Sequence, residues 1–123
     1  MTANADDVVE HRPLIVAGSG IAGLSAAIDA GRSNNEPLVF EGDEPGGQLT
    51  LTTEVDNYPG FPEGISGPEL VQNMKKQAQR FGAEIENGII ESVDAEERPF
   101  TVHLKNGDVY TADAVIAASG ASA

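Results

Sequence analysis

Short apolar runs and one helical pattern alternate at the start of the chain. Leu14–Val16 is a continuous apolar run, which predicts a buried strand. Ile21, Leu24 and Ile28 then recur at helical spacing, and residues 37–41 (PLVFE) predict a second strand. This order is a βαβ unit, for which we expect parallel strands and a right-handed crossover.

The pattern after residue 65 predicts a second helix. Residues 66–69 (SGPE) form a capping box with proline in the first turn, which is typical of a helix N-terminus. Gly82 is placed to end this helix. The apolar positions of the segment share one helical face, namely Leu70, Met74, Ala78 and Phe81. We therefore expect an amphipathic helix that packs on the predicted strands.

The last third of the chain predicts strands. Short strands are expected at Ile85 and at residues 89–93, and residues 100–105 alternate between apolar and polar side chains before Asn106-Gly107, a strong hairpin signal. Residues 114–118 (AVIAA) predict a further buried strand. We expect one α/β domain of Rossmann-like architecture over residues 12–123, with a parallel central sheet and a small antiparallel hairpin layer. Residues 1–11 are polar and acidic and are expected to form an N-terminal tail.

A long segment between the two predicted helices shows no period. Residues 42–66 are rich in Gly, Pro and Thr, yet they contain apolar side chains such as Leu49, Val55 and Phe61. A loop of this length in a small domain is usually functional or disordered, and its apolar content argues against disorder. We expect it to be functional.

Composition removes several classes of function. The 123 residues contain no Cys, which excludes disulfides, thiolate nucleophiles and dithiol redox centres in this sequence, and only two His, which disfavours a zinc site. Twenty acidic residues against seven basic ones give a net charge of −13, which disfavours nucleic-acid binding. No apolar run approaches the ~20 residues of a membrane span, and no secretory leader is evident. We expect a soluble, cytoplasmic protein.

The acid excess bears on the environment of the protein. Self-repulsion at this charge opposes folding in dilute salt, and at ~1 M salt a Debye length of about 3 Å removes most of it. Only Lys75, Lys76 and Lys105 are lysines. Abundant acid with scarce lysine favours a salt-loving (halophilic) host, and the alternative is an ordinary acidic cytosolic protein.

A glycine motif carries the chemistry. Gly18, Gly20 and Gly23 form G-x-G-x-x-G between the first predicted strand and the helix, as in a dinucleotide-binding turn. The helix N-terminus offers N–H groups to a pyrophosphate. Glu41 ends the second strand 18 residues after Gly23, close to the spacing of a carboxylate that binds ribose hydroxyls. The motif predicts a dinucleotide site but does not choose between NAD and FAD, and the alternative is a purely structural glycine turn.

The following segment resembles a known family. Residues 44–50 (EPGGQLT) and 52–62 (TTEVDNYPGFP) closely resemble the flavin-contacting segment of bacterial and archaeal thioredoxin reductases. The resemblance continues at residues 64–70 (GISGPEL), 98–100 (RPF) and 117–123 (AASGASA). It implies FAD as the cofactor and the three-layer ββα FAD-binding fold, incomplete at the C-terminus.

The resemblance also implies a role for individual residues. The pyrophosphate of FAD would lie against Gly18, Ser19, Gly20, Ile21, Ala22 and Gly23. The adenosine ribose would lie against Glu41 and Gly42, and Ile90 would offer its backbone to the adenine. The ribityl chain and the isoalloxazine ring would lie along Gly47, Gln48, Leu49, Thr53 and Asn57. The backbone of Ala118, Ser119 and Gly120 would approach the cofactor closely.

The sequence departs from this family in its redox parts. It has no Cys-x-x-Cys pair and no second glycine motif for NADPH, and the family's later return segment is absent. We therefore expect no catalytic residue, no metal ligand and no turnover from these residues alone. The missing NADPH-binding and Cys-x-x-Cys half would be a separate chain, or the chain is a fragment. The alternatives are a non-catalytic FAD- or ADP-binding module, a folded remnant and, ranked lowest, an NAD-specific domain. Lys75 and Lys76 are expected on a solvated helix face.

Overall fold

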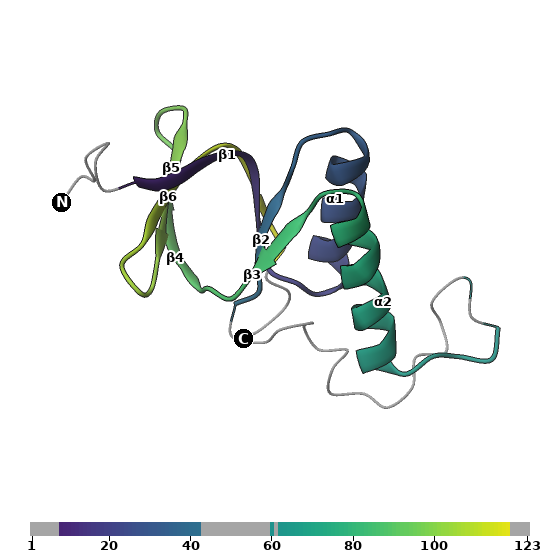
Figure 1. The fold of residues 1–123 in the computed structure, drawn as a ribbon. Coiled ribbons are helices and arrows are strands. Elements are labelled where there is room, and N and C mark those ends of the chain that lie inside the picture. The colour runs from purple at the N-terminus through teal and green to yellow at the C-terminus, as the bar shows by residue number, and fades with distance from the viewer. Residues whose placement is uncertain (1–7, 43–59, 61, 119–123) are drawn as a thin grey trace.

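The structure is a computed structural model that describes residues 8–42, 60 and 62–118 (Figure 1). Six strands and two helices are present in these ranges. In chain order they are β1 (Val8–Ala17), α1 (Ile21–Arg32), β2 (Leu38–Phe40), α2 (Gly67–Arg80), β3 (Glu84–Glu86), β4 (Ile90–Asp94), β5 (Phe100–Leu104) and β6 (Val109–Ala117). The predicted βαβ unit and the second helix are thus confirmed in type and order.

The strands form one mixed sheet in the order β3-β2-β1-β6-β5-β4. β1 lies at its centre and pairs in parallel with both β2 and β6, and β2 pairs in parallel with β3. β4, β5 and β6 are antiparallel to one another. The predicted parallel core with an antiparallel hairpin part is confirmed, and β6 belongs to both.

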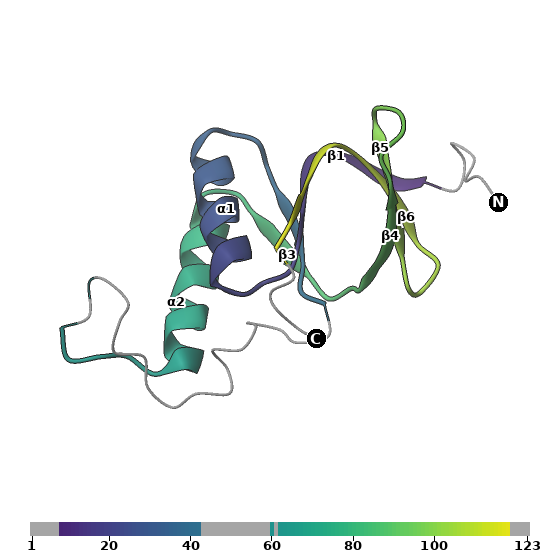
Figure 2. The ribbon, with the colours of Figure 1, turned by 180° about the vertical axis from the view of Figure 1, so that it is seen from behind.

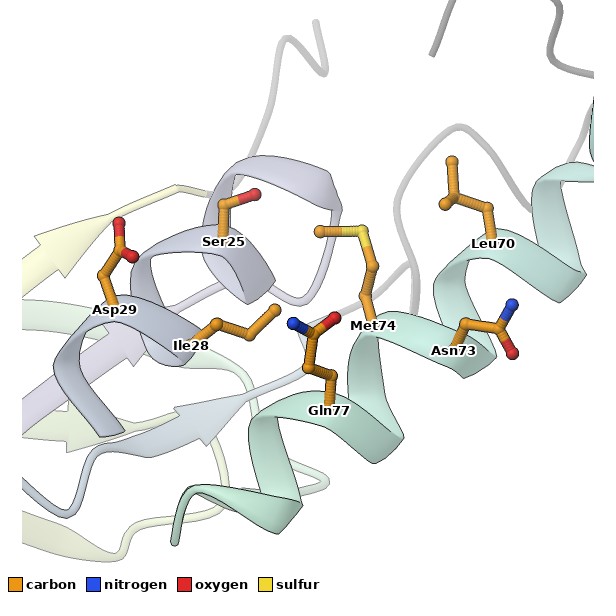
Figure 3. Close-up of a pocket in the computed structure, with 7 residues that line it drawn as sticks. All are labelled: Ser25, Ile28, Asp29, Leu70, Asn73, Met74 and Gln77. Atoms are coloured by element: carbon orange, nitrogen blue, oxygen red, sulfur yellow. The ribbon is translucent and has the colours of Figure 1, made fainter. Parts of the chain in front are cut away.

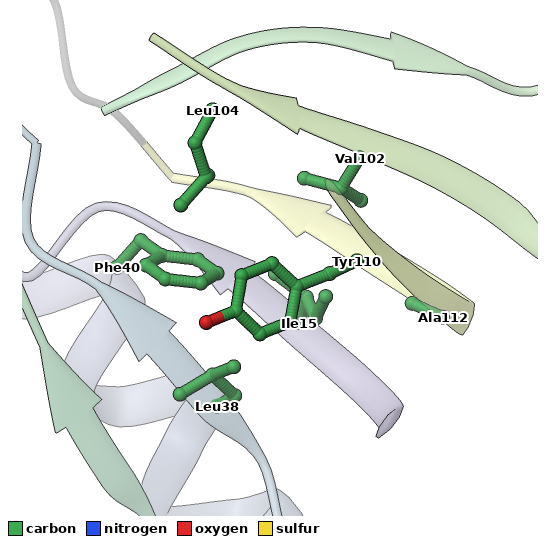
Figure 4. Packing of buried hydrophobic residues seen from close by; sticks show 7 residues of the cluster. All are labelled: Ile15, Leu38, Phe40, Val102, Leu104, Tyr110 and Ala112. Carbon is green, nitrogen blue, oxygen red and sulfur yellow. The ribbon is translucent and has the colours of Figure 1, made fainter. Parts of the chain in front are cut away.

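Alternate residues of the parallel strands face two different layers. Val16 and Val39 point to α1 and α2, which lie together on one side of the sheet (Figures 1 and 2). Ile15 and Phe40 point to the other side, where β5 and β6 fold over them (Figure 4). There the rings of Phe40 and Tyr110 meet edge to face, with centroids 5.1 Å apart. The central strands are therefore covered on both faces, which explains their continuous apolar runs.

The ends of α2 follow the sequence signals. The hydroxyl of Ser66 accepts a hydrogen bond from the Glu69 backbone N–H at 3.2 Å, as the capping box predicts. At the other end Gly82 has a φ of +95°, and the N–H of Ala83 donates to the Ala78 carbonyl at 3.1 Å. This is the six-to-one bond of a Schellman motif, which favours glycine at that position. Both predicted boundaries are confirmed.

β1 begins earlier than expected. Residues 8–11, which the sequence assigned to the polar tail, lie in this strand and pair with the first residues of β6. His11 bridges to its neighbour, with its Nδ1 2.7 Å from the Thr111 hydroxyl and its Nε2 3.3 Å from the Asp113 carboxylate. Backbone pairing extends the strand through polar residues because a long partner strand lies beside it.

β6 differs from its prediction in two ways. The hairpin strand at Val109 and residues 114–117 of the predicted apolar run are one strand, and the second half of that strand is not buried. Ala114, Ile116 and Ala117 are exposed. Ala114 and Ile116 pair with Leu14 and Val16 and so share their helix-side face, but the two helices of the described part pack mainly over β1 to β3, and α1 makes only a small contact with β6. The prediction of burial is therefore wrong for these residues.

Arg12 is a buried charge that no sequence pattern predicted. Its guanidinium donates to the carboxylates of Glu10 and Glu84 at 3.0 and 3.1 Å and to the Glu36 carbonyl at 2.9 Å. Burial lowers the pKa of Arg12, but the hydrogen bonds to Glu10 and Glu84 outweigh burial and raise the pKa above its usual value. Arg12 thereby ties β1 to β3 at the amino ends of the parallel strands.

Neither α1 nor α2, the helices of the described part, is long and apolar enough to cross a membrane.

Candidate functional site

The carboxyl ends of the parallel strands converge on one edge of the sheet. The N–H of Gly18, just after β1, donates to the Phe40 carbonyl at the end of β2 (2.8 Å). The N–H of Ala118, just after β6, donates to the Ala17 carbonyl (2.8 Å). Open α/β sheets bind ligands at this edge, so the fold places the predicted site residues where a ligand site is expected.

The turn after β1 requires its glycines for two different reasons. Gly18 has a φ of +113°, a backbone conformation that side chains disfavour. Gly23 lies in α1 directly over that turn, and a Cβ at this position would lie 2.1 Å from the Gly18 carbonyl oxygen. No other residue fits at Gly23 without moving backbone. The turn is therefore packed tightly against the first turn of the helix.

The N-terminus of α1 at this edge has no side-chain cap and no acidic residue in its own first turn. The helix begins at Ile21, and Gly20 at the N-cap provides no side-chain cap. Among the described residues, the first helical N–H with a backbone acceptor is that of Leu24, which donates to the Gly20 carbonyl at 2.9 Å. The N–H groups of Ile21, Ala22 and Gly23 precede it, so they are the donors that a pyrophosphate could engage.

Glu41 ends the neighbouring strand and is fixed by its backbone. Its N–H donates to the Glu86 carbonyl at 3.0 Å, and the next N–H, that of Gly42, donates to the Gly88 carbonyl at 2.8 Å. Gly42 has a φ of +77°. The carboxylate that would bind ribose thus lies one strand away from the glycine turn, as the predicted dinucleotide site requires.

Lys75 is the residue at this edge that the sequence analysis missed. Its ammonium forms an ion pair with the Glu41 carboxylate, and the two side chains are only 17% and 11% exposed. The expected solvated position is therefore wrong for Lys75, while Lys76 is exposed. The helical pattern could not reveal the pair because 34 residues separate its members.

Two further predicted residues lie beside this edge. Ala118 follows β6 next to the glycine turn, and its Cβ would lie 3.5 Å from a Cβ placed on Gly23. Ile90 opens β4, two residues beyond Gly88, and packs against the cluster around Phe40. Seven predicted residues fall outside the described part of the chain: Gly47, Gln48, Leu49, Thr53, Asn57, Ser119 and Gly120. The edge thus brings together Gly18 to Gly23, Glu41, Gly42 and Ala118.

The structure also contains a groove between α1 and α2, with a volume of about 260 Å³ (Figure 3). It is lined by Ser25, Ile28, Asp29, Leu70, Asn73, Met74 and Gln77. None of the described site residues lines it. Within the described ranges, no three potential metal-ligating side chains lie together.

Comparison with known proteins agrees with the resemblance. The chain is 53% identical to the thioredoxin reductase of Chlamydia pneumoniae over 116 residues, which covers 92% of this chain and 37% of that protein. It is 48% identical to the thioredoxin reductase of Vibrio cholerae over 115 residues, which covers 94% of this chain and 36% of that protein. The chain therefore spans about a third of the length of these relatives.

Solved structures give the same result. The thioredoxin reductase from Giardia duodenalis matches 90% of this chain and 36% of its own, with a TM-score of 0.84 and 37% identity. That of Streptococcus pyogenes matches 91% of this chain and 36% of its own, with a TM-score of 0.84 and 36% identity. The family model described as pyridine nucleotide-disulphide oxidoreductase matches residues 12–123. The chain belongs to the pyridine nucleotide-disulphide oxidoreductase family.

Proposed function

We propose that this chain is the FAD-binding part of a thioredoxin-reductase-like oxidoreductase. The turn from Gly18 to Gly23 would hold the pyrophosphate of FAD, and Glu41 would bind the adenosine ribose. In the full-length family, electrons pass from NADPH through FAD to a disulfide. The chain contains no Cys, so we infer that these residues do not reduce a disulfide by themselves.

One observation carries this proposal. The glycine turn, the N-terminus of α1 and Glu41 meet at the carboxyl edge of β1 and β2, and the Gly18 N–H donates to Phe40 directly between them. The tight contact of Gly23 with the Gly18 carbonyl leaves no room for a side chain at Gly23. A diphosphate needs such an open, N–H-lined approach, and the residues present fit the ADP half of FAD.

Each part of this edge has a distinct task in binding. The N–H groups at the start of α1 would donate to phosphate oxygens, and the positive end of the helix dipole would favour their charge. The Glu41 carboxylate would accept hydrogen bonds from ribose hydroxyls. FAD, when bound, supplies the hydride and electron transfer, while the protein supplies binding, orientation and electrostatics.

A second candidate is a non-catalytic module that binds FAD or only its ADP part. The described site residues serve both candidates, because Gly18 to Gly23, Glu41 and Gly42 all belong to the ADP half of the predicted site. The residues predicted to contact the flavin ring lie outside the described ranges. The two candidates therefore differ in whether the flavin ring itself is held.

The test is a titration of FAD into the purified protein in molar salt, followed by desalting and flavin spectroscopy. Retained flavin with a shifted absorbance and quenched fluorescence is the expected result. Competition distinguishes the two candidates: ADP displaces FAD in both, whereas FMN competes only if the flavin ring is held. A folded protein that retains no flavin and binds no ADP would refute both.

Molar salt in this test addresses the charge of the protein. We infer that the net charge of −13 adapts the chain to a salt-rich environment. Screening at ~1 M salt removes most of the self-repulsion, so the thermal midpoint should rise steeply with KCl. A midpoint that is unchanged between dilute and molar KCl would favour an ordinary acidic protein instead.

A further inference from the structure

The ion pair of Lys75 with Glu41 joins a helix to the nucleotide edge. Lys75 lies in the third turn of α2, and Glu41 directly follows β2. Both side chains are largely buried, at 17% and 11% exposed, and the Nζ donates to Oε1 of the carboxylate. Most surface ion pairs are solvated and weak, so a pair as buried as this one calls for an explanation.

The pair determines which carboxylate atoms are available. A carboxylate is an acceptor with two oxygens, and the backbone of Glu41 is already fixed through Glu86 and Gly88. The Lys75 ammonium holds Oε1 and so restricts the side-chain torsions of Glu41. Among the described residues, Lys75 donates to Oε1 and no residue donates to Oε2. Oε2 is therefore left as the acceptor for a hydroxyl donor.

The pair also balances charge. An isolated buried carboxylate is costly, and it would repel an anionic diphosphate bound one strand away. Glu86 lies on the adjacent strand β3, which adds a further negative charge near this edge. The Lys75 ammonium offsets the charge of Glu41 where the ligand itself is negative.

We propose that Lys75 is the positioning residue for Glu41, and that it enables this carboxylate to recognise ribose hydroxyls beside a diphosphate. The inference rests on the proposed function, because it requires that nucleotides bind at this edge. Lys75 does not contact the ligand in this proposal. It acts through Glu41, so its loss should lower the preference for ribose hydroxyls beyond the general weakening of diphosphate binding that follows from the lost charge balance.

The experiment compares the affinities for ADP and for 2′,3′-dideoxy-ADP by calorimetry in molar salt. Hydrogen bonds to a charged group predict that wild type prefers ADP by about 10- to 100-fold. In Lys75→Met this preference should fall to about 3-fold or less, since the carboxylate is no longer held. Lys75→Arg should restore most of the preference. Lys76→Met is the matched control, because Lys76 is exposed on the same helix turn, and it should behave as wild type.

A second pair of variants distinguishes the loss of the Lys75–Glu41 interaction from general misfolding. Glu41→Gln removes the charge that Lys75 balances, so adding Lys75→Met to Glu41→Gln should change the ADP affinity by less than about 2-fold. Circular dichroism establishes that each variant is folded. Equal losses for ADP and the dideoxy nucleotide in Lys75→Met, or an effect of the same size in both backgrounds, would overturn the role of Lys75. Wild type that binds neither nucleotide would overturn the proposed function, and this inference with it.

Discussion

The two halves of the sheet are covered to different extents. In the parallel half, β1 to β3 with α1 and α2, every residue of β2 is buried because helices pack on one face and hairpin strands on the other. In the antiparallel half, β4 is exposed at four of its five positions, and the end of β6 is exposed on its helix side. Stability is therefore concentrated in the parallel half, and the nucleotide edge is built at the carboxyl ends of its strands.

The largest difference between the halves should appear at Phe40. This residue is 1% exposed and lies against Tyr110 and Leu104, so Phe40→Ala should lower the free energy of unfolding by about 3–5 kcal/mol. Val93 in β4 is 38% exposed, and Val93→Ala should lower it by less than ~1 kcal/mol. Urea unfolding in molar salt measures both. Similar losses for the two variants would contradict the contrast between the halves.

The next largest effect concerns a glycine from each half. Gly23→Ala places a Cβ 2.1 Å from the Gly18 carbonyl oxygen and should lower the free energy of unfolding by about 1–3 kcal/mol and weaken ADP binding. Gly107 in the β5–β6 turn has a φ of +100° with open space around it, so Gly107→Ala should cost about 1–2 kcal/mol through backbone strain alone. Calorimetry should find ADP affinity unchanged in Gly107→Ala. Equal ADP affinity in both variants would argue against a nucleotide site at the glycine turn.

A smaller effect is expected at the start of α2. Ser66→Ala removes the hydrogen bond from the Glu69 N–H and should lower the free energy of unfolding by about 1 kcal/mol. Ser92 is exposed in β4, and Ser92→Ala should stay within about 0.5 kcal/mol of wild type. Thermal unfolding of the two variants side by side tests the difference. If Ser92→Ala were the more damaging, the capping role of Ser66 would be refuted.

The smallest effect is a dependence on alkaline pH. Burial, together with the charges of Glu86 and Asp108, raises the pKa of Tyr110 above its usual value. The folded state therefore keeps the phenol proton after the unfolded chain begins to lose it near pH 10, so stability falls as the pH rises above about 10. Tyr110→Phe should remove this part of the decline and change little at neutral pH. The measurement is the urea midpoint against pH, and identical slopes in the two proteins would contradict it.

Local signals predicted much of this fold. The apolar run at Leu14–Val16, the capping box at Ser66 and the Asn106-Gly107 turn each depend on neighbouring residues, and each element formed where its signal lay. The same holds for the glycine turn, whose φ and close packing follow from the spacing of its glycines.

The features that the sequence did not reveal depend on distant partners. Arg12 bonds to Glu84, 72 residues away, and Lys75 pairs with Glu41, 34 residues away. The exposure of Ile116 depends on which part of the sheet the helices cover, and the start of β1 at Val8 depends on the length of β6. No local period contains such information, because it arises only when separated segments meet.

The pairing of β1 with β6 has a consequence for the order of events in folding. Val8 pairs with Val109 and Ala17 with Ala117, so about 100 residues of chain must be closed into a loop before the central strand has both neighbours. Ribosomes add about 5–20 residues per second, so β1 waits on the order of 5–20 s for β6 to be synthesised. Non-local parallel pairing is also slow in itself. The edge that would bind a nucleotide is thus completed late, and until then β1, which leads into the glycine turn, has a partner strand on only one side.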